Sequence, residues 1–206
     1  KTDYKVVGTR PIRHDGYDKV TGRAIYGADM KLPGLIWAVC VRSPHAHANI
    51  KSIDTSAAEA ADGVFAVITG ADMPEAPSKL VDLGEGAINF KWASNKLMAD
   101  DKVLYKGHPV AAVAATDRYA AEEAARMVVV EYEVLPSITN VVDALTEDAP
   151  ILLEDLVGDD LGEDVTNTNM ATHTRDEFGD VEGAMNSAAH TIEREYNMQM
   201  VHQGYI

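Results

Sequence analysis

Residues 19–50 read KVTGRAIYGADMKLPGLIWAVCVRSPHAHANI, and the fold prediction depends on them. Two turn signals, Thr21-Gly22 and Leu32-Pro33-Gly34, bracket a short aromatic run. Residues 35–41 are apolar without interruption, which is typical of a buried strand. The run ends in polar residues 42–47, RSPHAH. This order predicts a turn, a buried strand and a histidine-bearing corner.

The composition allows a folded core and disfavours two classes of partner. The chain has 206 residues, of which 46% are hydrophobic and 6% aromatic, so Ala, Val, Leu and Ile must fill the core. Lys and Arg number 18 against 33 Asp and Glu, a net charge of −15. Such an excess repels nucleic-acid backbones and anionic membranes. No apolar run approaches the about 20 residues that span a bilayer, and the first ten residues carry no signal-peptide pattern. We expect a cytoplasmic protein that binds neither nucleic acid nor membrane.

Cys40 is the chain's one cysteine and lies within the apolar run. It has no partner for a disulfide within the chain, and no CxxC pair is present for zinc or an iron–sulfur cluster. We interpret Cys40 as a small buried hydrophobe. If the protein transfers electrons, the metal clusters must lie on another chain.

The pattern along the chain predicts an α+β fold rather than a doubly wound sheet. Residues 1–18 read as an extended arm, 19–136 as the first compact region, and 137–206 as an acidic connector followed by a further domain. Asp117 is a natural cap for a helix over 118–127, between apolar strands at 110–115 and 128–134. This strand, helix and strand predict a βαβ-like or split unit. Further strands are expected at 50–53, 64–69 and 102–105, and a helical turn at 56–61 with Thr55 or Ser56 as its cap.

Three segments have weaker patterns. Residues 71–100 have little periodicity and read as a long loop or insertion. Residues 154–180 are rich in Asp and Glu, which favours a solvated, extended connector. Asp180 is expected to cap a helix over 181–189, and residues 190–198 alternate as a half-buried strand would.

Several blocks, in order, resemble the molybdopterin-binding large subunit of molybdenum hydroxylases. That family includes xanthine dehydrogenase, aldehyde oxidoreductase, aerobic-type carbon monoxide dehydrogenase and 4-hydroxybenzoyl-CoA reductase. The resemblance extends over about residues 10 to 206. Besides the opening stretch, the blocks are IDTS at 53–56, GVFAV at 63–67, KGHPVAAV at 106–113, YEVLP at 132–136, GDVEGA at 179–184 and VHQGYI at 201–206.

The resemblance implies an α/β hammerhead domain at 19–136 and the beginning of a molybdopterin-binding domain after it. It implies a molybdopterin-type molybdenum cofactor held mainly by another chain or by residues missing here. Iron–sulfur clusters would lie on partner subunits, where FAD is an additional candidate cofactor. His202 and Gln203, in the last block, are the residues that would approach the cofactor; no catalytic residue and no metal ligand is expected. Family large subunits are several times longer, so the chain is either a fragment or one half of a split subunit.

Four polar features of the sequence have alternative interpretations. His45 and His47 share a face on an extended segment, and we favour contacts with backbone groups at the corner over a metal site. Arg42 either caps the corner, which we favour, or pairs with a carboxylate of a partner. His108 is interpreted as a solvent-facing turn residue, with a role beside a cofactor entrance as the alternative. The Gly84-x-Gly86 pattern is a weak phosphate-binding signal, since no helix follows it.

Two functions follow as hypotheses. The first is the N-terminal segment of an oxidoreductase that hydroxylates an aldehyde or an aromatic N-heterocycle with oxygen from water. In it, this segment would form a structural lobe, one wall of the substrate funnel and a docking surface, inactive alone. The alternative is a non-catalytic α/β interaction or scaffold module. By the same resemblance, the residues that would select the substrate lie outside this chain.

Overall fold

A computed structural model describes residues 4–77, 80–82, 87–199 and 201. The chain divides into two compact units, Lys1–Ser137 and Ile138–Ile206. Each unit has its own sheets, and we describe each by itself. The mixed α+β class expected from the sequence is confirmed, with small, largely antiparallel sheets in both units.

The first sheet of unit 1 has three antiparallel strands in the order β1-β7-β3. The bounds are Trp37–Arg42 for β1, Pro109–Ala115 for β7 and Val64–Thr69 for β3. Val113 of β7 lies opposite Val39 of β1 and Val67 of β3, so these three side chains share one face. The central position of β7 buries most of its side chains, as its unbroken apolar sequence requires.

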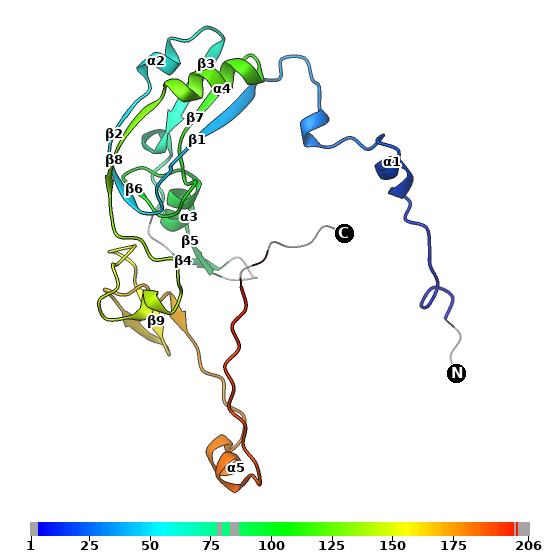
Figure 1. Ribbon diagram of the computed structural model, residues 1–206, viewed down its shortest axis with the longest axis vertical. Helices are drawn as coiled ribbons and strands as arrows, with labels where there is room; N and C mark the ends of the chain where they lie inside the picture. The colour runs from blue at the N-terminus through cyan, green and yellow to red at the C-terminus, as the bar shows by residue number, and fades with distance from the viewer. Residues whose placement is uncertain (1–3, 78–79, 83–86, 200, 202–206) are drawn as a thin grey trace. The chain divides into compact units, whose positions relative to one another are not determined.

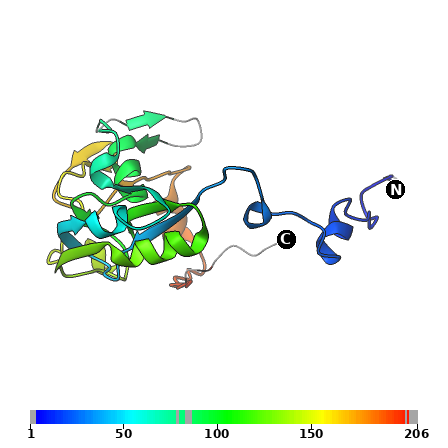
Figure 2. The same cartoon turned by 90° about the horizontal axis from the view of Figure 1, so that it is seen from above.

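Helix α4, Arg118–Met127, covers this face of the sheet (Figures 1 and 2). It begins as the sequence predicted, because Asp117 Oδ1 accepts hydrogen bonds from the backbone N–H groups of Tyr119 and Ala120. Its buried residues, Ala121 and Ala124, are small and allow the helix to approach the strands closely. The core here also contains side chains from the short helix α2, Ser56–Glu59. The fully or nearly buried members of this core are Ala58, Ala111, Val113, Ala124 and Val128.

A second antiparallel sheet has the order β6-β2-β8. Its strands are β6 at Lys102–Val103, β2 at Ala48–Asp54 and β8 at Val129–Val134. The elements β7, α4 and β8 follow each other as predicted, but β7 and β8 belong to different sheets. The predicted order of strand, helix and strand is confirmed, but it does not form the βαβ-like or split unit expected, because α4 links two different sheets. A second core joins them, built on Ala48, Ala99, Val103 and Val110.

The predicted burial of the strand at 35–41 is wrong within this chain. Strand β1 forms, but Trp37 is 38% exposed and Cys40 is exposed as well. The reason is position: β1 is an edge strand, and α4 covers one face of the sheet only. The interpretation of Cys40 as a small buried hydrophobe is therefore wrong as well.

Residues 71–100 are not one long loop. The 3-10 turn η2, Gly70–Asp72, is followed by a hairpin of β4, Leu80–Asp82, and β5, Ala87–Asn89. Helix α3, Phe90–Leu97, comes next, and the Asn89 side chain accepts a hydrogen bond from the Lys91 N–H at its start. The strands are too short to show alternation, which explains why sequence periodicity missed them.

The segment before β1 has two short helical elements. They are α1, Gly16–Val20, and the 3-10 turn η1, Gly27–Asp29. Asp15 pairs with Arg13 and Lys19, and these two bonds lower the pKa of its carboxyl to about 2. None of the residues in α1 is buried.

Unit 2 contains a small sheet where the sequence predicted a solvated connector. Its order is β10-β9-β11, with β9 at Gly158–Asp160, β10 at Glu163–Val165 and β11 at Thr172–His173. The pairings tolerate the acidic side chains because Asp159, Glu163 and Asp164 are exposed, while half-buried Asp160 bonds to His173. The remaining elements are η3, Asp143–Leu145, and α5, Val181–Ser187.

The end of unit 2 bears out one expectation and corrects another. Asp180 caps α5, with its Oδ1 accepting from the Gly183 N–H at 2.8 Å. Residues 190–198 do not form the expected strand, because they pair with no neighbouring strand in the part of the chain that is described. Within the same ranges, no helix is long and apolar enough to cross a bilayer.

Gly70 provides a test of this fold. A Cβ at position 70 would lie 2.5 Å from Asp100 Cα and 2.6 Å from Ala99 O, so backbone would have to move. We expect Gly70→Ala to lower the free energy of unfolding by about 1–3 kcal/mol, measured by urea denaturation. Gly27→Ala is the matched control, because a Cβ there meets nothing within 4 Å. Equal denaturation midpoints for the two variants would contradict the close approach.

Candidate functional site

The polar corner after β1 is bonded to the turn before β7. Arg42 Nη1 donates to the Gly107 carbonyl at 2.9 Å. Backbone bonds run from Ser43 N–H to the His108 carbonyl and from Gly107 N–H to the Ser43 carbonyl, both at 2.9 Å. Arg42 therefore caps the corner, as favoured from the sequence.

His108 is buried, with 0% exposure, although the sequence interpretation placed it in solvent. Its Nδ1 accepts from the Leu104 N–H at 3.2 Å, and its Nε2 donates to the Asn95 carbonyl at 2.6 Å. Its ring stacks on Tyr105 with 4.3 Å between centroids. One nitrogen accepts and the other donates, which is the pattern of a neutral imidazole. Burial lowers the pKa of His108, in agreement with that state.

His47 holds the end of unit 1. Its Nδ1 donates to the Pro136 carbonyl at 2.6 Å, and its own carbonyl accepts from the Leu135 N–H at 3.0 Å. The side chain is 4% exposed, and its buried Nε2 has no hydrogen-bond partner among the described residues. His47 thus fixes the chain immediately before the division between the two units at 137/138.

His45 lies against a different group. Its ring meets Tyr132 edge-on, with 5.1 Å between ring centroids. Burial raises the pKa of Tyr132, partly offset by a hydrogen bond with Ser43. The structural role favoured for the two histidines is confirmed for His47 by its backbone bond, while His45 contacts a ring. In the part of the chain that is described, no three His, Cys, Asp or Glu side chains gather as metal ligands would.

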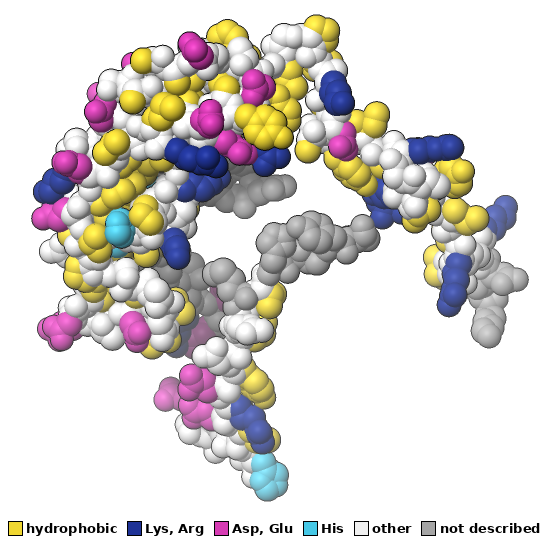
Figure 3. Space-filling model, turned by 45° about the horizontal axis from the view of Figure 1, so that its top comes forward, with side chains coloured by type: hydrophobic (Ala, Val, Ile, Leu, Met, Phe, Trp, Pro, Cys, Tyr) yellow, Lys and Arg dark blue, Asp and Glu magenta, His cyan; other side chains and the backbone are white. Residues whose placement is uncertain are grey.

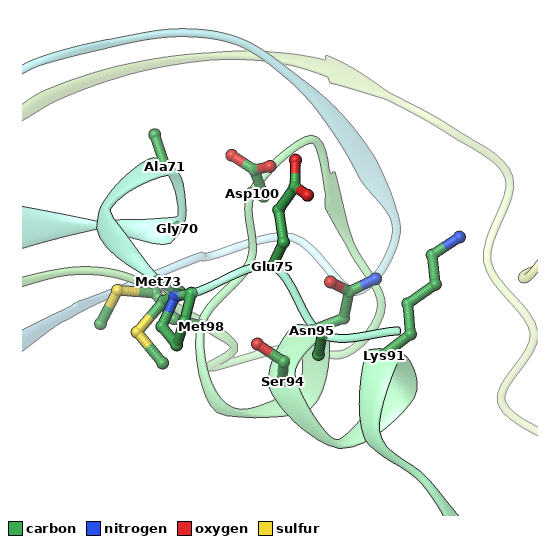
Figure 4. A pocket seen from close by; sticks show the side chains of 11 residues that line it. Gly70, Ala71, Met73, Glu75, Lys91, Ser94, Asn95, Met98 and Asp100 are labelled. Atoms are coloured by element: carbon green, nitrogen blue, oxygen red, sulfur yellow. The ribbon is translucent and has the colours of Figure 1, made fainter. Parts of the chain in front are cut away.

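A pocket of about 340 Å³ lies between η2 and α3 (Figure 4). Gly70 and Ala71 form one wall, and Ser94 and Asn95 of α3 form another. Figure 4 shows the carboxylates of Glu75 and Asp100 on the same side, with the Lys91 side chain extending away from them. The thioethers of Met73 and Met98 complete the lining.

The electrostatics of this pocket disfavour anions. Two carboxylates, Glu75 and Asp100, outnumber the one ammonium group of Lys91, so the local potential is negative. Asn95 links the pocket to the corner, because its carbonyl accepts the hydrogen bond from His108. The sequence interpretation missed the pocket, since it assigned 71–100 to a loop. The capping pair Asn89–Lys91 was the signal that could have revealed α3.

Unit 2 has an open groove of about 470 Å³ beside its small sheet. His173 Nδ1 and Asp160 Oδ1 are 2.7 Å apart, and Arg175 pairs with Glu177 at 2.9 Å. These side chains are exposed, so water competes for each contact. Polar side chains of the acidic segment line the groove and stay open to solvent.

The remaining predicted site residues lie outside the described residues. His202 and Gln203, expected near a cofactor, are among them, and so is the Gly84-x-Gly86 pattern. Their roles stay predictions. The structure thus brings together Arg42, Ser43 and His108 at one corner.

Comparison with known proteins gives a consistent match. Residues 21–136 match the family "Aldehyde oxidase and xanthine dehydrogenase, a/b hammerhead domain". The chain is 41% identical over 162 residues to the carbon monoxide dehydrogenase large chain of Afipia carboxidovorans, covering 79% of this chain and 19% of that one. It is 35% identical over 193 residues to the 6-hydroxypseudooxynicotine dehydrogenase complex subunit gamma of Paenarthrobacter nicotinovorans, covering 92% and 23%.

A solved structure agrees. Quinoline 2-oxidoreductase from Pseudomonas putida 86 superposes with a TM-score of 0.60 at 33% identity, covering 75% of this chain and 21% of that chain. The chain therefore spans about a fifth of the length of these relatives.

His108 makes a prediction about acid stability. Because the pKa of folded His108 lies below its ordinary value of 6.5, its stabilising contribution is complete above pH 6.5 and decreases as the pH falls below it. His108→Ala should cost about 1–3 kcal/mol at pH 7.5, since two buried backbone groups lose their partners. His108→Gln keeps a donor and cannot titrate. It should therefore flatten the dependence of unfolding free energy on pH between 7 and 5, measured by urea denaturation at each pH. If the unfolding free energy of the wild type and of His108→Gln fell equally with pH, the assignment of His108 as a buried neutral imidazole would be contradicted.

His47 makes a prediction about the link between the units. His47→Ala removes the donor to the Pro136 carbonyl. We expect cleavage by a nonspecific protease within residues 137–142 to become several-fold faster, with cut sites identified by mass spectrometry. His47→Asn is the matched control, because its amide N–H can occupy the place of Nδ1–H and should keep cleavage slow. Unchanged cleavage in His47→Ala would show that this bond does not hold the segment.

Proposed function

The chain belongs to the aldehyde oxidase and xanthine dehydrogenase family, and we propose that it serves as the hammerhead-bearing part of a molybdenum-dependent oxidoreductase. The proposed reaction hydroxylates an aldehyde or an aromatic N-heterocycle, with the oxygen taken from water. The observation that carries the proposal is the match of residues 21–136 to the family's hammerhead domain, together with a fold similar to quinoline 2-oxidoreductase.

The described residues do not fit the molybdenum cofactor by themselves. Molybdopterin carries a phosphate and two thiolate sulfurs, all anionic, and needs cations or clustered backbone N–H groups. The pocket between η2 and α3 presents the carboxylates of Glu75 and Asp100 instead, and both residues are exposed to solvent. The ring nitrogens of His108 are already bonded to backbone. We therefore place the cofactor on residues of the large subunit outside the described part, with His202 and Gln203 the nearest candidates in this chain.

This chain's own contribution is then structural. The bonds from Arg42, Ser43 and His108 make the corner after β1 a rigid unit. A rigid lobe of this kind can form one wall of a substrate passage and a surface for partner subunits. The cofactor would supply the two-electron oxidation, and the electrons would leave through iron–sulfur and flavin centres on partner chains.

The relatives' names support an assembly of several chains. One is called a large chain and another a subunit of a dehydrogenase complex. We propose that this chain likewise works within a hetero-oligomer in the cytoplasm. Its net charge of −15 supports partners other than nucleic acid or anionic membrane.

The test is the composition of the native complex. We expect the chain, purified under native conditions, to be associated with the rest of a large subunit and about one molybdenum atom per copy, measured by native mass spectrometry and elemental analysis. The complex should oxidise an aldehyde or a N-heterocycle. Cells grown without molybdate provide the control, in which activity should fall while the chains stay assembled. A metal-free, stable monomer in the native preparation would contradict the proposal and favour the scaffold function instead.

A further inference from the structure

The carbonyl end of α3 is held by two aromatic rings from outside the helix. The last carbonyls of a helix have no partner within it and need one elsewhere. In α3, the Asn95 carbonyl accepts a hydrogen bond from His108 Nε2 at 2.6 Å. The next carbonyl, that of Lys96, accepts one from the Tyr105 hydroxyl at 2.8 Å, and the two rings stack on each other. We call these four residues, Asn95, Lys96, Tyr105 and His108, the ring clamp.

The imidazole of the ring clamp also closes the turn that carries it. His108 Nδ1 accepts from the Leu104 N–H at 3.2 Å, and the His108 N–H donates to the Tyr105 carbonyl at 3.1 Å. One ring therefore joins α3 to the turn between β6 and β7. This chain alone buries the ring completely, so any further protein packed on unit 1 would only add to that cover.

The ring clamp accepts the neutral imidazole only. A proton on Nδ1 would make this atom a donor, and it would then face the Leu104 N–H. It would also place a charge in a site closed to water. Burial is the main cause that lowers the pKa of His108, and it outweighs the bond to the Asn95 carbonyl, which raises that pKa. A protonated ring regains water only by leaving the clamp, and both backbone groups then lose their partner.

The charged groups around the ring do not compensate a charge on it. Those on α3, on the corner after β1 and on the turn are exposed to solvent, and they are Arg42, Lys96, Asp100, Asp101 and Lys106. Two more cations, Lys91 of α3 and Lys102 of β6, are half-buried. Figure 3 shows acidic and basic side chains spread over the surface of unit 1 in one view. In the part of the chain that is described, no carboxylate bonds to the His108 ring, so burial decides its protonation.

We propose that His108 is a pH-sensitive latch on the carbonyl end of α3. The neutral ring keeps the ring clamp closed, and the protonated ring leaves it, so that the end of α3 and the turn at 104–108 open while both sheets stay folded. Ser94 and Asn95 form one wall of the pocket beside η2, so the latch makes that wall sensitive to pH. All its bonds lie within unit 1, so the latch goes beyond the proposed function and does not depend on it.

Backbone bonds outside the ring clamp confine the opening. The Ala99 N–H donates to the Pro109 carbonyl at 2.8 Å, and Ala99 is buried in the second core. The Asp101 carbonyl accepts from the Ile50 N–H, also at 2.8 Å. Neither bond involves a titratable side chain, so both persist when the ring is protonated. The segment after α3 therefore stays anchored to the two sheets.

Hydrogen exchange measures this opening directly. The chain, purified under native conditions, is exchanged at pH 7.5 and at pH 5.5. Peptide mass spectrometry then gives protection factors, which are corrected for the intrinsic effect of pH on exchange. A ring in solvent titrates near 6.5, so at pH 5.5 the open state gains up to about tenfold. We expect the amides of residues 94–98 to lose protection by about three- to tenfold, while those of α4 change less than twofold.

Two variants separate titration from capping. His108→Gln keeps a donor and cannot titrate, so the protection of residues 94–98 should be the same at both pH values. Tyr105→Phe removes the hydroxyl that bonds to the Lys96 carbonyl but leaves His108 to titrate. Its protection should be lower at both pH values, with the ratio between them kept.

Three results would overturn the latch. One is equal protection of residues 94–98 at both pH values in the wild type. Another is an equal loss of protection in α4, which would indicate unfolding of the whole unit. The third is an unchanged pH effect in His108→Gln, which would assign the titration to another histidine, such as His45 or His47. If His108→Gln does not fold, the comparison of residues 94–98 with α4 in the wild type and in Tyr105→Phe still decides.

Discussion

The pairing of β7 with β1 on one side and β3 on the other is the constraint on which unit 1 depends. Strand β7 is apolar along its length, so it must be covered on both faces and paired on both edges. The two neighbours satisfy its backbone, and α4 covers one face through Ala121 and Ala124. The second sheet follows from this arrangement, because α4 leads directly into β8. The face of this sheet opposite α4 stays exposed in this chain.

The polar groups at the ends of these strands are satisfied locally. Where β1 ends and β7 begins, Ser43 and His108 are buried, so backbone groups beside them need hydrogen-bond partners within the protein. Arg42, Ser43 and His108 supply those partners. His47 does the same at the end of unit 1, where it holds the Pro136 carbonyl. Hydrogen bonds to backbone groups thus account for the positions of the two buried histidines.

The structural role of these polar residues agrees with the family to which the chain belongs. The proposed reaction requires a cofactor with anionic groups, whereas the described pocket carries the negatively charged carboxylates of Glu75 and Asp100. In the proposed function the chain contributes shape, through the bonded corner after β1 and the segment that His47 holds at the end of unit 1. Part of the acidic segment of unit 2 folds into a sheet, with most of its carboxylates in solvent.

The sequence by itself determined the elements with strong local signals. Asp117 and Asp180 marked helix starts, and the apolar runs marked β1, β3 and β7, because caps and continuous apolar runs act over a few residues. The pattern of elements along the chain indicated the α+β class, and the ordered family blocks implied the hammerhead domain. Only the tertiary structure decided that His108 is buried, that Cys40 is exposed and that β8 leaves the sheet of β7. Those outcomes depend on which surfaces meet across long separations in the chain, such as the contact of His108 with Asn95 and the single layer of α4 over one face. The pattern of residues within a short stretch of sequence does not report such contacts.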